Sequence, residues 1–468
     1  MRSVAVIVLA AGLGTRMKSS VVKVLHPIVG RPMLLHTLGN IAGLKAEKTV
    51  VVLGHQADRV KAVLPVDVLT ALQKEQLGTA HAASTGLKKL GGFTGTVVVV
   101  SGDTPLLGTD TFKRLVASHR KAGADATVLT AVLPDPTGYG RIIRAASGVA
   151  SVADIERIVE HKDASPSERA VTEINAGTYC FEASALKAAL KQVRSDNKQG
   201  EYYLTDVIAI IKRRGGKVGA VQAECPQDAL GINSRVELAQ AEKVLRRAVN
   251  RRLMESGVTM PDPESTYIGA GVSVGKDTVV YPGNFITGNS VIGQGCLLYP
   301  GNFISDSTVK DGAVIKGWSV LSESCVDEGA QVGPFAHVRP GSRVCRDARV
   351  GNFVELKKTL VGEGSKASHL SYLGDAIIGR DVNVGAGTIT CNYDGYEKYL
   401  TVIEDGVFVG SDTQFVAPVR VGKGAVIAAG STITSDVPKD SLAISRTPQA
   451  NRPGWAKKRR EEKSKGGK

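Results

Sequence analysis

An aliphatic residue recurs at every sixth position over much of the second half of this chain of 468 residues. An amphipathic helix repeats near 3.6 residues and a strand near two, so neither element alone explains the spacing. A short strand followed by a bend in each unit does explain it, with one aliphatic side chain pointing inward per unit. Three runs carry the pattern: Ile268, Val274, Val280, Ile286, Ile292, Leu298 and Ile304; Val314, Val320, Val326, Val332, Val338, Val344, Val350 and Leu356; and Val409, Phe415, Val421, Ile427 and Ile433.

A longer repeat indicates how many units make one coil. Residues 281–286 read YPGNFI, and YPGNFI returns at 299–304, which is 18 residues later. Eighteen is three sixes, so each coil should have three faces, and the sequence predicts a hexapeptide-repeat parallel β-helix. The repeats extend from about residue 258 to about residue 440, and we expect irregular insertions near 306–313 and 390–407.

The first half has a different organisation, in which apolar strand-like runs alternate with helical stretches. The runs 4–10, 49–53 and 96–100 are β-rich and bounded by glycine or turn residues. This alternation predicts an α/β, Rossmann-like domain with a mainly parallel sheet over residues 1–233. Residues 234–257 predict a connecting amphipathic helix that stops near Gly257. The β-helix domain, with its basic C-terminal tail, is then expected over residues 258–468.

Charge and composition limit the classes of partner and compartment. The formal charge is +14, but residues 457–468 hold seven Lys/Arg and two Glu, so this tail alone supplies +5. The tail lacks interleaved aromatic residues, so we interpret it as a solvated end and expect no nucleic-acid partner. None of the six cysteines forms a Cys-x-x-Cys pair, which favours a reduced, cytoplasmic protein. No stretch of apolar residues is long enough to predict a membrane span.

The first predicted strand leads into a glycine-rich turn, LAAGLGTRM at 9–17. Such a turn directs backbone N–H groups at phosphate, and Arg16 and Lys23 add cations. It is not a Walker A loop, and Met17 stands where a dinucleotide fingerprint has its third glycine. Asp103 follows another apolar run at the expected carboxyl end of a strand, where it suits Mg²⁺. The alternative is an Asp that only caps the following turn.

Several further segments resemble the uridylyltransferase half of a known family, the bifunctional N-acetylglucosamine-1-phosphate uridylyltransferase/glucosamine-1-phosphate acetyltransferases. They occur in the order of that family: 9–17 with KVLH at 23–26, QKEQLGTAH at 73–81, GYGR at 138–141, VEHKD at 159–163, EINAG at 173–177 and GINSR at 231–235. Two positions depart from the family pattern. Val22 replaces the usual proline before the lysine, and Ser101 replaces a frequent tyrosine before Gly-Asp.

The resemblance implies a role for each matching residue. Leu9, Ala10, Gly12, Arg16 and Lys23 would bind UTP, the last two through its phosphates. Gln73, Gly78 and Thr79 would contact the uracil, and Gly140, Glu160 and Asn175 would hold the amino sugar. Asp103 and Asn233 would hold Mg²⁺, with Asn233 also contacting the substrate. The implied reaction is in-line attack of the sugar phosphate on UTP, which depends on positioning and charge neutralisation.

Polar residues interrupt the hexad pattern, which argues for chemistry in the β-helix itself. His337 and His369 are its only histidines, too few for a three-histidine metal site within one chain. A lone histidine can be purely structural, but the surrounding segments resemble the acetyltransferase half of the same family. These segments are GPFAHVRPG at 333–341, GNFVELKK at 351–358, SHLSYLGD at 368–375, NVGAGT at 383–388, CNYDG at 391–395 and VGSDT at 409–413.

The resemblance assigns the acetyl-transfer roles as well. His369 would be the general base, and Glu355 is expected to orient it. Arg339, Lys357 and Tyr372 would bind the sugar phosphate, and Asn392 and Tyr393 would complete the pocket. Asn383, Ala386, Ser411, Ala429 and Arg446 would contact acetyl-CoA. Family members are homotrimers with a left-handed β-helix, and their product, UDP-N-acetylglucosamine, serves peptidoglycan and lipopolysaccharide synthesis.

Two other functions are compatible with parts of the pattern. One is a single nucleotidylyltransferase whose β-helix only oligomerises or regulates, and the intact segments around His369 and 383–388 argue against it. The other is a binding module without activity, which the retained Arg16, Lys23, Asp103 and Asn233 oppose. The sequence therefore favours a bifunctional enzyme acting on glucosamine 1-phosphate, acetyl-CoA and UTP.

Overall fold

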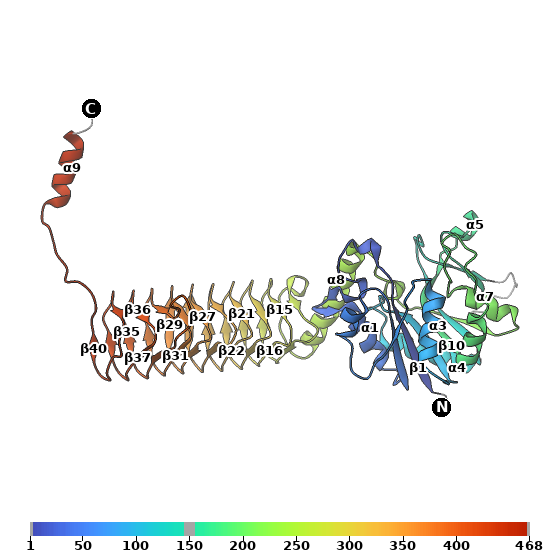
Figure 1. Ribbon diagram of the computed structural model, residues 1–468, viewed down its shortest axis with the longest axis horizontal. Helices are drawn as coiled ribbons and strands as arrows, with labels where there is room; N and C mark the ends of the chain where they lie inside the picture. The colour runs from blue at the N-terminus through green and yellow to red at the C-terminus, as the bar shows by residue number, and fades with distance from the viewer. Residues whose placement is uncertain (1–2, 145–154, 466–468) are drawn as a thin grey trace. The chain divides into compact units, whose positions relative to one another are not determined.

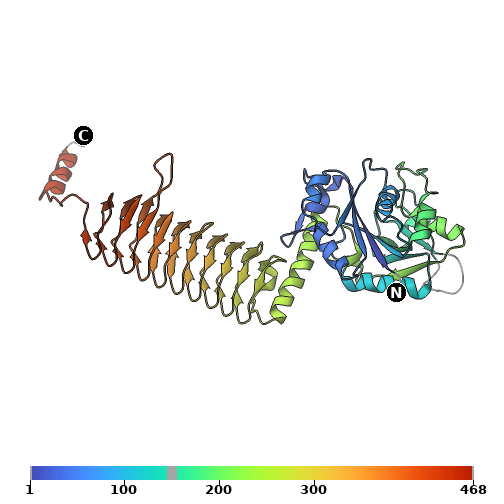
Figure 2. The ribbon, with the colours of Figure 1, turned by 60° about the horizontal axis from the view of Figure 1, so that its bottom comes forward.

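The computed structural model describes residues 3–144 and 155–465, and the chain divides into two compact units, Met1–Ala248 and Val249–Lys468. The division falls inside the long helix α8 (Arg235–Glu255), which covers nearly all of the predicted connecting helix. Figures 1 and 2 show the two kinds of unit, one with helices around a sheet and the other a stack of short strands.

A mainly parallel sheet forms the centre of the N-terminal unit. Its strands run in the order β11-β7-β10-β6-β1-β4-β5, and only β10 is antiparallel to its neighbours in that path. The hairpin strands β8 and β9 extend the sheet beside β10. The bounds are β1 Val4–Ala10, β4 Lys48–Leu53, β5 Leu69–Leu72, β6 Thr96–Ser101, β7 Ala126–Val132, β8 Arg141–Arg144, β9 Ile155–Val159, β10 Glu173–Glu182 and β11 Val218–Gln222; β2 Pro27–Ile28 and β3 Arg31–Pro32 pair separately.

Helices cover both faces of this sheet, which explains why the central strands β1 and β6 are almost entirely apolar rather than alternating. In β1, Ile7 packs into one core with α3, α6 and α7, whereas Val6 and Val8 pack into the other with α1 and α4. The helices are α1 Met33–Ala42, α2 Ala57–Lys61, α3 Thr79–Lys89, α4 Thr109–Ala122, α5 Pro166–Arg169, α6 Ala183–Leu190 and α7 Asp206–Arg213, with short 3-10 turns η1 Thr15–Met17, η2 Lys23–Leu25 and η3 Pro226–Ala229.

The second unit is a parallel β-helix with three sheets, preceded by the turn η4 (Pro263–Ser265). One sheet contains β12 Tyr267–Ile268, β15 Phe285–Thr287, β18 Phe303–Ser305, β21 Val320–Ser322, β24 His337–Val338, β27 Glu355–Lys357, β30 Tyr372–Gly374, β33 Ile389–Cys391, β36 Gln414–Val416 and β39 Thr432–Ile433. The next contains β13 Ser273–Val274, β16 Val291–Ile292, β19 Thr308–Val309, β22 Cys325–Val326, β25 Arg343–Val344, β28 Leu360–Val361, β31 Ala376–Ile378, β34 Thr401–Ile403 and β37 Val419–Val421. The third contains β14 Val279–Val280, β17 Leu297–Leu298, β20 Val314–Ile315, β23 Gln331–Val332, β26 Arg349–Asn352, β29 Lys366–His369, β32 Asn383–Val384, β35 Phe408–Val409, β38 Val426–Ile427 and β40 Leu442–Ala443.

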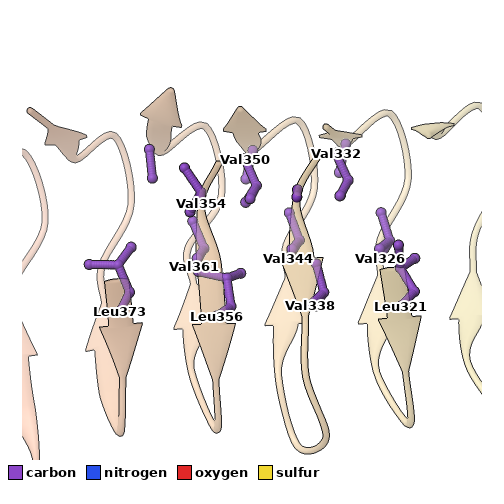
Figure 3. Packing of buried hydrophobic residues seen from close by; sticks show 14 of the residues in the cluster. Leu321, Val326, Val332, Val338, Val344, Val350, Val354, Leu356, Val361 and Leu373 are labelled. Carbon is purple, nitrogen blue, oxygen red and sulfur yellow. The ribbon is translucent and has the colours of Figure 1, made fainter. Parts of the chain in front are cut away.

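Inward-pointing aliphatic residues, stacked from coil to coil, form the continuous core of this unit (Figure 3). The prediction was wrong at Val314 and Val320, because the structure buries Ile315 and Leu321 instead. The cause is the length of a coil. Phe285 pairs with Phe303 after three complete hexads, but the pairing of Leu297 with Val314 spans one residue fewer. The region near 306–313 is thus one residue short rather than an insertion.

The second predicted irregularity is an insertion. Asn383 pairs with Phe408, well beyond the length of a regular coil, and the extra residues form a loop closed by a bridge between Tyr393 and Lys398. After the β-helix, the C-terminal helix α9 (Trp455–Lys465) exposes all of its residues. Among the described residues, no helix is both long and apolar enough to cross a bilayer.

Candidate functional sites

A cavity of about 580 Å³ opens at the carboxyl ends of β1 and β6, where a parallel sheet is expected to bind ligands. Asp103 lies just beyond the end of β6, as predicted. The cavity is lined by ten of the predicted residues: Leu9, Ala10, Gly12, Lys23, Gln73, Gly78, Thr79, Asp103, Glu160 and Asn175. Segments that are far apart in the sequence therefore meet at one site.

One end of the cavity holds a compact polar cluster. The Lys23 ammonium donates to Asp103 Oδ2 and, at 3.0 Å, to Asn233 Oδ1. Asn233 is fixed by the start of α8, where the Ser234 side chain accepts from the Glu237 N–H at 3.2 Å. Glu237 Oε2 in turn accepts from the N–H groups of Ser234 at 2.9 Å and Asn233 at 2.5 Å. This capping box holds Asn233 rigidly in front of the helix.

These two oxygen donors fit a divalent cation. Asp103 and Asn233 already converge on one positive group, the Lys23 ammonium, and hard cations prefer such oxygen ligands. Across the described part of the chain, no group of three His, Cys, Asp or Glu side chains is arranged to hold a metal. A cation at this position would therefore take its remaining ligands from substrate phosphates and water, as Mg²⁺ does in many nucleotide sites.

Residues of the 73–81 segment form another part of the cavity wall. Gln73 donates through Nε2 to Gly78 O at 3.2 Å, and Thr79 Oγ1 accepts from the Leu204 N–H at 2.9 Å. Gly78 has a φ of +111°, and a Cβ there would stand 2.5 Å from the carbonyl oxygen of Tyr202. Only glycine fits this close approach, so the segment is held against the 201–205 segment.

Glu160 and Asn175 lie together at a third part of the cavity. Thr205 Oγ1 donates to Glu160 Oε1 at 3.1 Å, and burial raises the pKa of Glu160. The Asn175 N–H donates to Gly140 O at 2.9 Å. The Asn175 side chain donates through Nδ2 to the Tyr179 hydroxyl at 2.7 Å. The backbone of Gly140 is thus tied directly to the strand that carries Asn175.

Three predicted residues lie outside the cavity lining. Gly140 and Asn233 are nevertheless linked to it through Asn175 and Lys23. Arg16 is an exposed residue of η1.

Of the two departures from the family pattern, Ser101 lines the cavity. Val22 is buried beside Lys23 and has a φ of −59°, the angle that a proline would adopt.

In the β-helix, His369 ends β29 and is exposed. Its Nδ1 lies 2.9 Å from Asn352 Oδ1, one coil earlier. Within this chain Glu355 forms an ion pair with Arg339 at 2.7 Å, so its orientation of His369 stays a prediction. Asn352 was missed because it lies one full coil before its partner, and only the coil register reveals that the two residues are neighbours.

A group of cations surrounds Lys357, the last residue of β27. Contact with Lys398 lowers the pKa of the half-buried Lys357, and Arg339 acts in the same direction. Two ammonium groups held side by side favour an anion between them. Tyr372 lies on the neighbouring strand, opposite Glu355. Lys398 was missed by the sequence reasoning, because it comes from the loop inserted between β33 and β34.

The two polar residues at the start of that loop have local partners. Asn392 donates through Nδ2 to Asp375 Oδ2, and Asp375 in turn donates its N–H to Lys357 O at 2.8 Å. The Tyr393 hydroxyl donates to Gly395 O at 2.5 Å. The loop is thereby fastened to the strand that carries Lys357.

The residues predicted to contact acetyl-CoA follow successive strands of one sheet. Asn383 lies on β32, and Ala386, Ser411, Ala429 and Arg446 follow β32, β35, β38 and β40. The Asp412 N–H donates to Ala386 O at 2.7 Å, the Gly430 N–H donates to Ser411 O at 2.8 Å, and Arg446 Nη1 donates to Ala429 O at 2.6 Å. The backbone carbonyls of Ala386, Ser411 and Ala429 are thus each bonded to the next coil, and the ladder that these residues form along one edge suits an elongated ligand.

A Rossmann-like sheet with a polar cavity at its carboxyl edge, followed by a β-helix with a histidine and a cationic face, defines a nucleotidyltransferase fused to a hexapeptide-repeat transferase. The sequence comparisons agree. Residues 6–200 match the MobA-like NTP transferase domain, and residues 400–435 match the bacterial transferase hexapeptide family of six repeats.

Similarity to known proteins extends over the whole chain. It is 52% identical over 459 residues to the bifunctional protein GlmU of Trichlorobacter lovleyi, covering 98% of this chain and 99% of that protein. It is 52% identical over 457 residues to that of Pelobacter propionicus and 50% identical over 452 residues to that of Shouchella clausii, covering 97% of this chain and 98% of the relative in both. The chain belongs to the GlmU family. It is a bifunctional enzyme with the uridylyltransferase and acetyltransferase activities of UDP-N-acetylglucosamine synthesis.

Proposed function

We propose that the two activities are divided between the two units. Residues 1–233 would carry uridylyl transfer and residues 258–468 acetyl transfer, with the helix over 234–257 between them. The enzyme would first acetylate glucosamine 1-phosphate with acetyl-CoA and then transfer a uridylyl group from UTP to the product. The observation that supports this most strongly is the pair formed by Asn352 and His369.

That pair would select which ring nitrogen of His369 carries the proton. The Asn352 Oδ1 atom can only accept, so the facing Nδ1 of His369 carries the proton and Nε2 keeps its lone pair. Nε2 then removes a proton from the 2-amino group of glucosamine 1-phosphate as the nitrogen attacks the thioester carbonyl. The carbon–sulfur bond breaks and coenzyme A leaves. Arg339, Lys357 and Tyr372 would hold the sugar phosphate, with Asn392 and Tyr393 beside them.

The ladder of Ala386, Ser411, Ala429 and Arg446, with Asn383 before it, would bind acetyl-CoA along the edge next to His369. This edge and the Lys357 face lie on different sheets of one β-helix, so a complete site needs a surface brought close to both. We propose a homotrimer, in which neighbouring β-helices supply that surface.

In the N-terminal cavity, a phosphate oxygen of N-acetylglucosamine 1-phosphate attacks the α-phosphorus of UTP, and pyrophosphate leaves. Lys23 and Arg16 would neutralise the phosphate charge, with Leu9, Ala10 and Gly12 presenting the backbone. Gln73, Gly78 and Thr79 would contact uracil, and Gly140, Glu160 and Asn175 the amino sugar. Asp103 and Asn233 would hold Mg²⁺, which supplies further charge neutralisation.

The state of the cysteines supports a cellular compartment for the enzyme. All six cysteines are free, and reduced thiols persist in the cytoplasm. We therefore propose a cytoplasmic enzyme.

Product analysis by mass spectrometry tests the division of labour. The protein is incubated with glucosamine 1-phosphate, acetyl-CoA, UTP and Mg²⁺. UDP-N-acetylglucosamine should form, should disappear with His369→Ala, and should return when N-acetylglucosamine 1-phosphate is supplied. Asn233→Ala should give the opposite pattern, with acetylated sugar accumulating. If His369→Ala still acetylates the sugar, the assignment of the base is wrong.

A further inference from the structure

Tyr179 is a buried residue of the N-terminal cavity that none of the roles above uses. It lies on β10, lines the cavity, and is only 3% exposed. Its ring stacks on Phe181 with centroids 5.6 Å apart, so its position in the sheet is fixed. Its hydroxyl is the end of the side chain that reaches the polar part of the cavity, beside Asn175.

The hydrogen bonds of this hydroxyl are incomplete. Tyr179 accepts from Asn175 Nδ2 at 2.7 Å, which uses an oxygen lone pair. A phenol carries one proton to donate, and no acceptor for it is found in residues 3–144 or 155–465. Burying a donor without a partner costs free energy, so such a group is usually satisfied by a ligand or water.

The proton also stays on the oxygen. Burial raises the pKa of Tyr179 far above neutrality, and the negative charge of nearby Glu160 acts in the same direction. Tyr179 is therefore a permanent donor at working pH rather than an acid or a base.

The neighbours of Tyr179 indicate what it faces. Asn175 has its Oδ1 occupied by the Gly177 N–H at 3.0 Å, and its Nδ2 points at Tyr179. Glu160 is an acceptor, with one oxygen already bound to Thr205. The cavity wall around Asn175 thus offers a carboxylate acceptor and, separately, the Tyr179 donor. An amino sugar presents both matching kinds of group.

We propose that Tyr179 donates a hydrogen bond to an acceptor oxygen of the amino sugar in the uridylyl-transfer site, and so contributes to recognition of the sugar phosphate. The proposal rests on the proposed location of the sugar beside Glu160 and Asn175. The acceptor is either the acetamido carbonyl or a ring hydroxyl oxygen, which share the same chemistry. The competing explanation is that Tyr179 only positions Asn175 and never touches the ligand.

The variant Tyr179→Phe removes only the hydroxyl, and uridylyl-transfer kinetics of the full chain provide the test. We expect the KM for N-acetylglucosamine 1-phosphate to rise about tenfold, as for loss of one hydrogen bond to a buried partner. The KM for UTP should not change. Thr178→Val is the matched control, because it deletes a buried hydroxyl from the neighbouring position of β10 that does not line the cavity. Melting temperatures of all variants verify folding.

A second substrate separates direct contact from positioning. Glucosamine 1-phosphate lacks the acetamido carbonyl, so Tyr179→Phe should change its KM little if that carbonyl is the acceptor. If a ring hydroxyl is the acceptor, the 3-deoxy, 4-deoxy or 6-deoxy analogue of N-acetylglucosamine 1-phosphate should show the same insensitivity. If every sugar loses affinity equally, Tyr179 only positions Asn175 and the proposal is overturned.

Other results also decide the matter. An unchanged sugar KM, an equal rise in the UTP KM, or the same effect from Thr178→Val would each overturn the proposal. In all these cases the wild-type protein still makes the nucleotide sugar. If the wild-type protein transfers no uridylyl group to either sugar phosphate, it is the proposed function that fails.

Discussion

Lys23 occupies the position where Asp103 and Asn233 would hold a metal ion, so the lysine and the cation compete in the free enzyme. The side chains of Lys23 and Asp103 are only 14% and 10% exposed, which leaves little solvent to weaken the pair. Hydrogen bonds to charged groups are worth about 1.5–3 kcal/mol, or roughly 10- to 150-fold in affinity. Lys23→Met should therefore raise the affinity of the free enzyme for a divalent cation at least about tenfold.

Mn²⁺ is a suitable probe, because electron paramagnetic resonance measures the free ion directly in the absence of nucleotide. Arg16→Gln is the matched control, since it removes a neighbouring cation that bonds to neither metal ligand. When UTP is added, the wild type should gain more Mn²⁺ affinity than Lys23→Met, because its lysine can transfer to the phosphates. The reasoning fails if Lys23→Met binds Mn²⁺ no more tightly than the wild type, or if Arg16→Gln has the same effect.

Two further predictions concern His369 and His119. Asn352→Ala should lower the acetyl-transfer kcat about fivefold, because it removes one neutral hydrogen bond. Asn352→Asp should move the acid limb of the acetyl-transfer pH profile to higher pH, because a carboxylate stabilises the protonated imidazole. Unchanged profiles would show that Asn352 does not orient the base. Burial lowers the pKa of His119 despite the opposing Glu182 carboxylate, so as the pH falls the unfolded state, with its pKa of 6.5, takes up a proton before the folded state does. The free energy of unfolding should therefore fall as the pH drops below about 6.5, and His119→Gln should reduce that loss. Urea unfolding midpoints at about pH 7.5 and about pH 5.5 measure the loss in each protein. Equal losses in the wild type and the variant would contradict the expected contribution of His119.

Much of the fold could be predicted from the sequence, because the period and register of the aliphatic residues determine how the strands of the β-helix are arranged. A six-residue aliphatic repeat has no simple explanation other than the β-helix, and the recurrence of one segment after three hexads identified its three faces. The errors at Val314 and Val320 have a specific cause. In a region of alternating inward and outward residues, loss of one residue exchanges the faces. Both Val314 and Ile315 are aliphatic, so hydrophobicity could not decide which of them points inward.

The candidate site of the N-terminal unit was predictable where a motif lies at the end of a strand. Asp103 follows the end of a strand, and Gly78 adopts a backbone conformation that requires glycine. Both positions therefore stand out in the sequence. Tyr179 was not recognised, because it lies just after its motif and its apolar ring has an ordinary place in the core of a strand. Only the structure shows that its hydroxyl lies beside Asn175 and has no acceptor among the described residues.

The partner of His369 was missed because of the register between coils. Sequence reasoning searched for a carboxylate near the histidine and found Glu355 in the preceding motif. One coil here is one residue shorter than three hexads, so the residue beside His369 is Asn352, and Glu355 instead lies opposite Tyr372. Within the described residues, the bonded neighbour of His369 is thus an amide, whose oxygen accepts a hydrogen bond but carries no charge. An amide of this kind can fix the orientation of the imidazole ring without placing a charge beside it.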